Sequence, residues 1–257
     1  MTRKALSLCA ALAAALPGVV AGQDGLDPKF YEEARYETCI RTTRTAPDRA
    51  YEEARSWEVL GGGAPARHCV ALALYGMGQY DDAATMLESV AQELPEDTPP
   101  QLRAGVLAQA AKSWEEVNQL ERAVANQTTA LDLVPDDPDL LTDRALTLAL
   151  AGNYWEAIDD LNRVIELDPY NADAFVFRAS AYRFVDAPEL ALEDANQALV
   201  LDPEHPEGLL ERGNIRRLLG DTNGARSDWL AVVELHGGRP AADAAQRNLE
   251  ILDIKAD

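Results

Sequence analysis

Two columns of charged residues recur at a fixed spacing in the second half of the chain. The arginines stand at equal intervals, and an aspartate follows each of them at the same shorter distance. The three pairs are Arg144 with Asp160, Arg178 with Asp194, and Arg212 with Asp228. A guanidinium forms paired hydrogen bonds with a carboxylate or a phosphate, so these columns could bind an anionic ligand or bond to each other.

The upstream sequence favours the internal pairing. In the two preceding segments the arginine positions hold Val70 and Ala110, and the aspartate positions hold Met86 and Asn126. Arginine and aspartate are therefore present together and absent together. We expect each arginine to form an ion pair with the aspartate of its own repeat, and the anion-binding interpretation remains the alternative.

Cys39 and Cys69 are the two cysteines outside the apolar N-terminal stretch, which contains Cys9. They could form a disulfide, remain buried free thiols, or bind a metal together with His68. The metal site is disfavoured because neighbouring helical residues point about 100° apart. A zinc site also needs three or four ligands. A disulfide is favoured if the protein enters an oxidising compartment.

No other motif predicts catalysis, a metal site or a cofactor. The run from Gly61 to Gly63 precedes a helix, but no Lys-Ser or Lys-Thr follows it, so we interpret it as a helix terminator rather than a phosphate cradle. The three histidines are scattered, and Gly-x-Ser-x-Gly, His-Glu-x-x-His and Gly-x-Gly-x-x-Gly are absent from the sequence.

The elements that must position these residues repeat with the same period as the arginines. Four columns share this period: Pro135, Pro169 and Pro203; Ala123, Ala157, Ala191 and Ala225; Leu133, Leu167, Leu201 and Leu235; and the arginines above. In one period, helical patterns run from Leu140 to Ala151 and from Tyr154 to Leu167, separated by a Gly-Asn turn. Neither helix buries its apolar stripe alone, so neighbouring units must stack.

This pattern resembles the tetratricopeptide repeat family. The segment 138–171 matches the consensus residues of that family at every position compared: Leu141, Ala145, Leu148, Ala157, Leu161 and Pro169. The resemblance implies an all-α, right-handed superhelical solenoid of about six helix hairpins with a C-terminal capping helix.

The pattern also divides the chain. A degenerate helix pair is expected at 28–63, followed by repeats at 64–97, 104–137, 138–171, 172–205 and 206–238, and by a capping helix and tail at 239–257. Six extra residues around Thr98-Pro99-Pro100 are expected to lengthen a loop or the next helix.

Charge narrows the range of partners. The 257 residues include 23 Lys and Arg against 44 Asp and Glu, a formal net charge of −21. Nucleic acid and anionic lipid both require a basic surface, so neither is expected as a partner. A partner attracted electrostatically should be basic.

The first 22 residues read as a secretory signal peptide. Arg3 and Lys4 precede an apolar stretch from Ala5 to Leu16, and small residues lead to a cleavage site after Ala21 or one residue later. This stretch is too short to span a bilayer, which needs about 20 apolar residues. We expect a periplasmic or secreted protein without membrane insertion after cleavage; an uncleaved anchor is the alternative.

The resemblance implies a non-enzymatic, exported bacterial-type scaffold that binds a peptide or protein segment in its concave groove. Carried onto this sequence, the groove residues are Tyr75, Lys112, Leu146, Leu150, Tyr170, Arg183, Phe184, Asn214 and Arg217. These residues could also be ordinary exposed or packing positions. The alternative functions are an enzyme or enzyme subunit on a helical solenoid, and an adaptor that presents substrates to a periplasmic protease.

Overall fold

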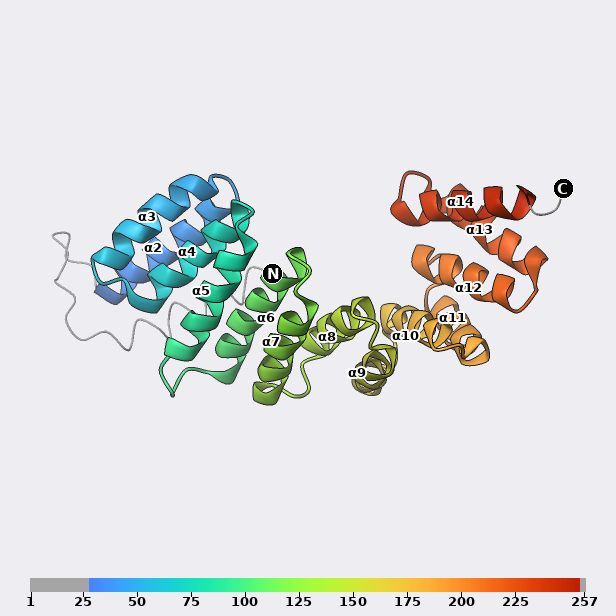
Figure 1. The fold of residues 1–257 in the computed structure, drawn as a ribbon, viewed down its shortest axis with the longest axis horizontal. Helices are drawn as coiled ribbons and strands as arrows, with labels where there is room; N and C mark the ends of the chain where they lie inside the picture. The colour runs from blue at the N-terminus through green and yellow to red at the C-terminus, as the bar shows by residue number, and fades with distance from the viewer. Residues whose placement is uncertain (1–27, 255–257) are drawn as a thin grey trace. The chain divides into compact units, whose positions relative to one another are not determined.

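A computed structural model describes residues 28–254, so the predicted signal peptide 1–22 and its cleavage site at Ala21 lie outside the described residues. Within 28–254 the chain forms thirteen α-helices and no strand (Figure 1). The helices are α2 (Pro28–Thr43), α3 (Pro47–Val59), α4 (Gly63–Gly76), α5 (Tyr80–Glu93), α6 (Pro100–Glu116), α7 (Leu120–Leu133), α8 (Pro138–Leu150), α9 (Tyr154–Leu167), α10 (Ala172–Phe184), α11 (Pro188–Leu201), α12 (Pro206–Leu218), α13 (Thr222–His236) and α14 (Pro240–Ile254). The expected all-α repeat solenoid is confirmed.

From α4 onward, the turn inside each hairpin contains a residue with positive φ. Gly78, Gly152 and Gly220 supply it at 77°, 85° and 84°. At the equivalent points Asn118 and Asp186 adopt 55° and 59°, as Asn and Asp do more readily than other side chains. The turn therefore recurs at the repeat spacing although its residue type varies.

The extra residues before the third hairpin lengthen its first helix. The helix α6 has 17 residues, whereas α8, α10 and α12 each have 13. Two prolines favour a helix start here, because proline is tolerated in the first turn of a helix.

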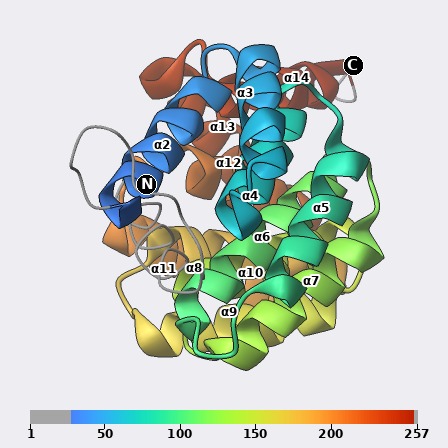
Figure 2. The same cartoon turned by 90° about the vertical axis from the view of Figure 1, so that its left-hand side faces the viewer.

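The helices fall into two compact units, one ending at Leu140 and the other beginning at Leu141. In the first unit α4 packs against α3 and α5, and α6 packs against α5 and α7 (Figure 2). In the second unit α10 packs against α9 and α11, and α12 packs against α11 and α13. None of the described helices is long and apolar enough to cross a membrane.

The predicted ion pairs within the repeats are confirmed. Each guanidinium donates two parallel hydrogen bonds to its aspartate: Arg144 to Asp160 at 2.8 and 2.7 Å, Arg178 to Asp194 at 2.7 and 2.7 Å, and Arg212 to Asp228 at 3.0 and 2.7 Å. All three aspartates are buried, whereas the arginines remain partly exposed. The pairs therefore join the first helix of a hairpin to the second.

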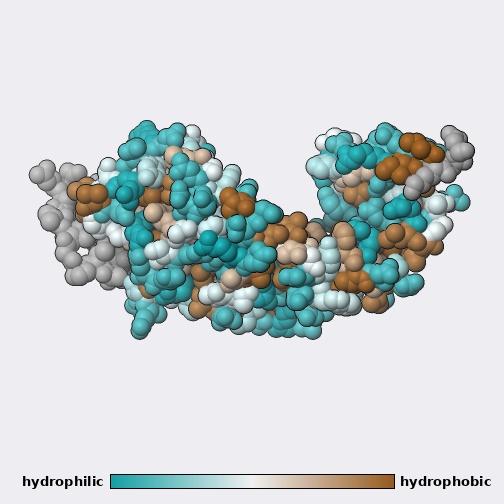
Figure 3. Space-filling model, in the orientation of Figure 1, coloured by the Kyte–Doolittle hydropathy of each residue, from teal (hydrophilic) through white to brown (hydrophobic). Residues whose placement is uncertain are grey.

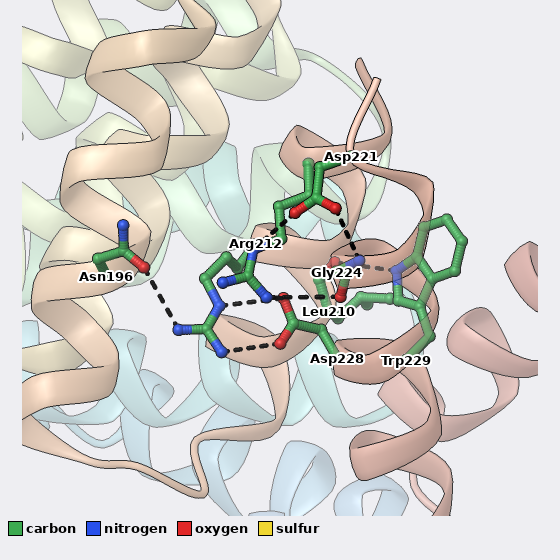
Figure 4. Close-up of polar contacts among 8 residues, drawn as sticks. Asn196, Leu210, Arg212, Asp221, Gly224, Asp228 and Trp229 are labelled. Carbon is green, nitrogen blue, oxygen red and sulfur yellow. Dashed lines mark hydrogen bonds and ion pairs between the residues drawn. The ribbon is translucent and has the colours of Figure 1, made fainter. Parts of the chain in front are cut away.

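The third guanidinium nitrogen of two arginines reaches the preceding repeat. Arg178 donates through Nη1 to Oδ1 of Asn162 at 2.7 Å, and Arg212 donates likewise to Asn196 at 3.3 Å (Figure 4). The side-chain hydrogen bond to Asp194 also raises the pKa of Arg178, which keeps it charged. Each of these two arginines therefore links the two helices of its own hairpin and also links that hairpin to the preceding repeat.

We expect Arg178→Met to lower the free energy of unfolding by about 3 kcal/mol, because it leaves the buried Asp194 carboxylate without its cation. The double variant Arg178→Met with Asp194→Leu should recover part of that loss. Denaturant unfolding followed by circular dichroism measures both.

The matched control is Arg49→Met, because Arg49 pairs with Glu53 on the surface, where its side chain is 74% exposed. That variant should unfold at the wild-type midpoint. If Arg49→Met and Arg178→Met lowered the free energy of unfolding equally, burial of the Arg178–Asp194 pair would contribute nothing to stability.

Candidate functional site

The first helices α10, α12 and α14 of the second unit form one continuous face, because α10 packs against α12 and α12 against α14. We call the surface presented by α8, α10, α12 and α14 the first-helix face. Its residues recur at the repeat spacing, so Asn248 on α14 follows Asn214 on α12 by one full period. The sequence therefore places like positions of successive helices side by side.

A chain of hydrogen bonds crosses three helices of this face. The guanidinium of Arg183 on α10 forms an ion pair with the buried carboxylate of Glu211 on α12. Asn214 donates to Oε2 of Glu211 at 3.2 Å, and Asn248 donates to Oδ1 of Asn214 at 2.9 Å. Arg183, one of the expected groove residues, is therefore neutralised within the protein.

An exposed apolar column borders this polar chain. Leu150, Phe184 and Leu218 end α8, α10 and α12, again one period apart, and their exposed fractions are 72%, 54% and 53%. The ring of Phe184 stacks on Tyr154 with centroids 4.7 Å apart, and the guanidinium of Arg183 lies 4.3 Å from the Phe184 ring centroid. Figure 3 shows hydrophobic residues gathered over α8 and α10.

Three other predicted groove residues of the second unit are also accessible. Leu146 lies one turn before Leu150 on α8 and is exposed. Tyr170, in the loop between α9 and α10, is 81% exposed. Arg217 is exposed on α12 and forms no ion pair with any residue in the described range.

Tyr75 and Lys112 belong to the first unit, so they are described apart from the others. The Tyr75 hydroxyl donates to Glu116 at 3.0 Å, and its ring meets the edge of Tyr80. Burial, and then the Glu116 carboxylate, raise the pKa of Tyr75 to about 12. Lys112 is exposed, with Nζ 3.9 Å from the Glu115 carboxylate.

Sequence reasoning identified Asn214 but missed its neighbours Glu211 and Asn248. The interval between Asn214 and Asn248 equals the repeat period, so it could have identified Asn248 as an equivalent position. Glu211 gave no such signal, because the equivalent positions one repeat away hold Phe177 and Ala245.

His68 is buried in the first unit between two neutral partners. Its Nδ1 lies 2.6 Å from the Tyr36 hydroxyl, and its Nε2 lies 2.5 Å from Oε1 of Gln109. An amide oxygen only accepts, so Nε2 carries the proton and Nδ1 accepts from Tyr36. Burial lowers the pKa of His68 to about 4, so the ring is neutral near pH 7.

Cys39 on α2 and Cys69 on α4 lie side by side, and Cys69 directly follows His68 in the sequence. Their Cα atoms are 6.2 Å apart, within the range that a disulfide spans, and both side chains are buried. Within residues 28–254 no three His, Cys, Asp or Glu side chains are grouped so as to hold a metal ion.

His68 should make the protein sensitive to acid. The unfolded state, with a histidine pKa near 6.5, binds a proton before the folded state does, so stability falls as the pH falls from 6.5 to 4. The full contribution is about 3 kcal/mol by linkage. Unfolding midpoints of the wild type and of His68→Gln, measured across this pH range, should converge as the pH falls. Parallel curves would contradict this prediction.

Comparison with known proteins gives a consistent family. Residues 70–97 and 112–182 match models of the tetratricopeptide repeat. Human tetratricopeptide repeat protein 13 is 29% identical over 113 residues, a match that covers 44% of this chain but only 13% of that protein.

Three solved structures share the fold at low identity. MamA from Desulfovibrio magneticus RS-1 superposes with a TM-score of 0.60 at 21% identity, covering 69% of this chain and 97% of that one. YrrB, described as a TPR protein with an unusual peptide-binding site, gives 0.58 at 21% identity, covering 71% and 89%. A repeat protein from Cytophaga hutchinsonii gives 0.64 at 16% identity, covering 87% and 95%. The family models thus place tetratricopeptide repeats at residues 70–97 and 112–182, and the solved structures show the same all-α repeat fold.

Proposed function

We propose that this protein is a non-enzymatic scaffold that binds a peptide or protein segment on the first-helix face of its second unit. The observation that carries the proposal is the exposed column of Leu150, Phe184 and Leu218 on three successive first helices. Single exposed apolar side chains are common on protein surfaces, but a column of them at the repeat spacing forms a contact surface.

The polar chain beside this column supports the same function. The amides of Asn214 and Asn248 are half-buried and held by neighbours, so they present fixed hydrogen-bonding groups next to apolar contacts. Apolar anchors with a few placed polar groups are typical of sites that bind a peptide. YrrB, which has the same fold, is described as having a peptide-binding site.

Charge supports a basic partner. The net charge of the chain is −21, and the internal pairing of Arg183 with Glu211 removes one of the cations that would have attracted an acidic segment. Complementary charge mainly accelerates association and excludes acidic competitors, whereas the apolar column supplies affinity.

The apolar column can be tested by truncation. A photo-crosslinking residue at position 218 first identifies the partner by mass spectrometry. The double variant Leu150→Ala with Phe184→Ala should then bind the purified partner at least about tenfold more weakly, because loss of an interface anchor costs about 1.4 kcal/mol or more.

The control is Val200→Ala, which truncates an apolar residue of similar exposure on the second helix α11. It should bind as the wild type does. Unchanged binding by the Leu150 and Phe184 variant, with helix content intact, would place the contact surface elsewhere. Arg183→Glu is unsuitable as a test, because it would set a second carboxylate against Glu211.

We also propose that the protein is exported to the periplasm or secreted, and that Cys39 and Cys69 form a disulfide there. The basic start and short apolar stretch support export, and the 6.2 Å separation of the two Cα atoms supports the bond. A bond across this sequence separation of 30 would add about 3–4 kcal/mol in the chain-entropy model.

One intact-mass measurement tests both parts of this proposal. Protein recovered from an exported fraction should lack residues 1–21 or 1–22 and should be two hydrogens lighter than its reduced form. An intact Met1 on membrane-bound material would overturn the export proposal. Two thiols that react with an alkylating agent under denaturing, non-reducing conditions would overturn the disulfide.

A further inference from the structure

The helix α2 lies against α3 and α4 in the first unit (Figure 2). In its range 32–43 the side chains of Tyr36, Cys39 and Thr43 are buried, and their spacing of three and four residues places them on one face of the helix. This face bears a phenol, a sulfur and a hydroxyl group, whereas α4 buries aliphatic side chains such as Val70 and Leu74. Specific contacts of these three groups therefore contribute to holding α2 in place.

Two of the buried residues of α2 contact consecutive residues of α4. The Tyr36 hydroxyl donates to Nδ1 of His68 at 2.6 Å, and the Cα atoms of Cys39 and Cys69 are 6.2 Å apart. Tyr36 and Cys39 lie about one turn apart on the same face of α2. A bond between the two sulfurs therefore also holds the Tyr36 hydroxyl opposite the His68 ring.

The contacts of α2 with α3 pass through Trp57. Its Nε1 donates to Glu32 at 2.7 Å, and the Arg35 guanidinium lies 5.0 Å from its ring centroid. Glu32 and Arg35 are only half-buried, so water competes for both side chains. These polar contacts therefore stabilise the position of α2 less than the same contacts would in a dry interior.

The packing between α2 and α3 also leaves a space beside Cys39. A pocket of 270 Å³ lies there, and Cys39, Ala54 and Trp57 are among its lining residues. Ala34 and Thr38, which also line the pocket, are exposed. The pocket is therefore open to solvent and gives a dissolved thiol a route to the sulfur of Cys39.

The C-terminal end of α2 is held by a close approach of backbones. A Cβ atom added at Gly76, the last residue of α4, would lie 2.9 Å from the carbonyl oxygen of Thr43 and 2.9 Å from Cβ of Pro47. The glycine thus lets the end of α4 pack directly against the connection between α2 and α3. Neither cysteine takes part in this contact, so it provides a pivot about which α2 can turn.

We propose that α2 is a redox-controlled latch, held against α4 when Cys39 and Cys69 are joined and released when they are reduced. This inference rests on the disulfide proposed above. A dithiol reductant supplies two electrons and two protons. The sulfur–sulfur bond of the protein breaks, both cysteines become thiols, and the dithiol itself becomes a disulfide. The helix α2 then turns about the contact of Thr43 with Gly76.

Release of α2 changes the surface of the first unit. Ala50 and Ala54 on α3 and Ala73 on α4 belong to the buried apolar cluster that contains both cysteines. When α2 turns away, part of this cluster meets water. Oxidation therefore covers an apolar surface that the reduced chain exposes.

The rest of the first unit is joined without this bond. Nε2 of His68 donates to Gln109 at 2.5 Å, which links α4 to α6, and Arg67 forms an ion pair with Glu93, which links α4 to α5. The helix α6 packs in turn against α5 and α7. Reduction should therefore open α2 without unfolding the helices from α4 to α7.

Hydrogen exchange measured by mass spectrometry tests the latch. The mature chain is oxidised in vitro with oxidised glutathione, and a matched sample is reduced with dithiothreitol. The amides of α2 should exchange at least about tenfold faster in the reduced sample, because the cross-link no longer limits local opening. The amides of α7, and those of α11 in the second unit, should exchange at the same rate in both samples. Reoxidation should restore the slow exchange of α2.

Two variants separate the bond from the contact beside it. Cys39→Ser with Cys69→Ser should show fast exchange of α2 with or without dithiothreitol. Tyr36→Phe removes the hydrogen bond to His68 but keeps both cysteines, so its oxidised form should open α2 less than reduction of the wild type does. If the double serine variant fails to fold, as judged by circular dichroism, the oxidised and reduced wild-type samples decide.

Equal exchange of α2 in the oxidised and reduced samples would overturn the proposal, because α2 would then be held without the bond. Equal acceleration of α2 and α7 would also overturn it, because the bond would then stabilise the whole unit rather than one helix. Two free thiols after treatment with oxidised glutathione would reject the latch outright. Free thiols found only in the exported protein would reject the earlier disulfide proposal, whereas the exchange rates of the chain oxidised in vitro would still decide whether α2 is a latch.

Discussion

The close approach of helices at fully buried alanines is the constraint on which this structure depends. Ala123, Ala157, Ala191 and Ala225 occupy one column of the second helices, and none of them is exposed to solvent. A larger side chain at these positions would push the helices of a hairpin apart. Because interiors are packed at the density of organic crystals, the displaced helix would lose its contacts along its whole length.

Close packing also explains why the Arg–Asp ion pairs can hold neighbouring helices together. Asp160, Asp194 and Asp228 are buried by the helices around them, so each carboxylate requires a cation and several donors at fixed positions. An arginine on the first helix supplies both, and in Arg178 and Arg212 the remaining nitrogen binds the preceding repeat. Within the second unit, these bonds therefore also fix the position of one hairpin relative to the next.

The first unit solves the same packing problem with different chemistry. Val70 and Ala110 replace the arginines, and the polar links pass instead through Trp114 and Glu88, and through Tyr36, His68 and Gln109. Glu88 on α5 also accepts a hydrogen bond from Asn126 and pairs with Arg122, both on α7, so it links two successive second helices. The two kinds of link differ because the arginine column of the second unit is absent from the first.

The sequence by itself determined the repeat period, the all-α fold and the pairing of Arg178 with Asp194, because each of these follows from spacing along the chain. It also indicated that Phe184 and Leu150 lie on the exposed part of the first-helix face, since equivalent positions of a repeat share an environment. Only the tertiary structure showed that Arg183 is neutralised by Glu211 and that His68 lies between Tyr36 and Gln109. Those contacts join residues 28 to 41 positions apart whose types do not recur from repeat to repeat, so no period predicts them. The distance between two such side chains depends on how the helices pack, and packing is a property of the folded chain.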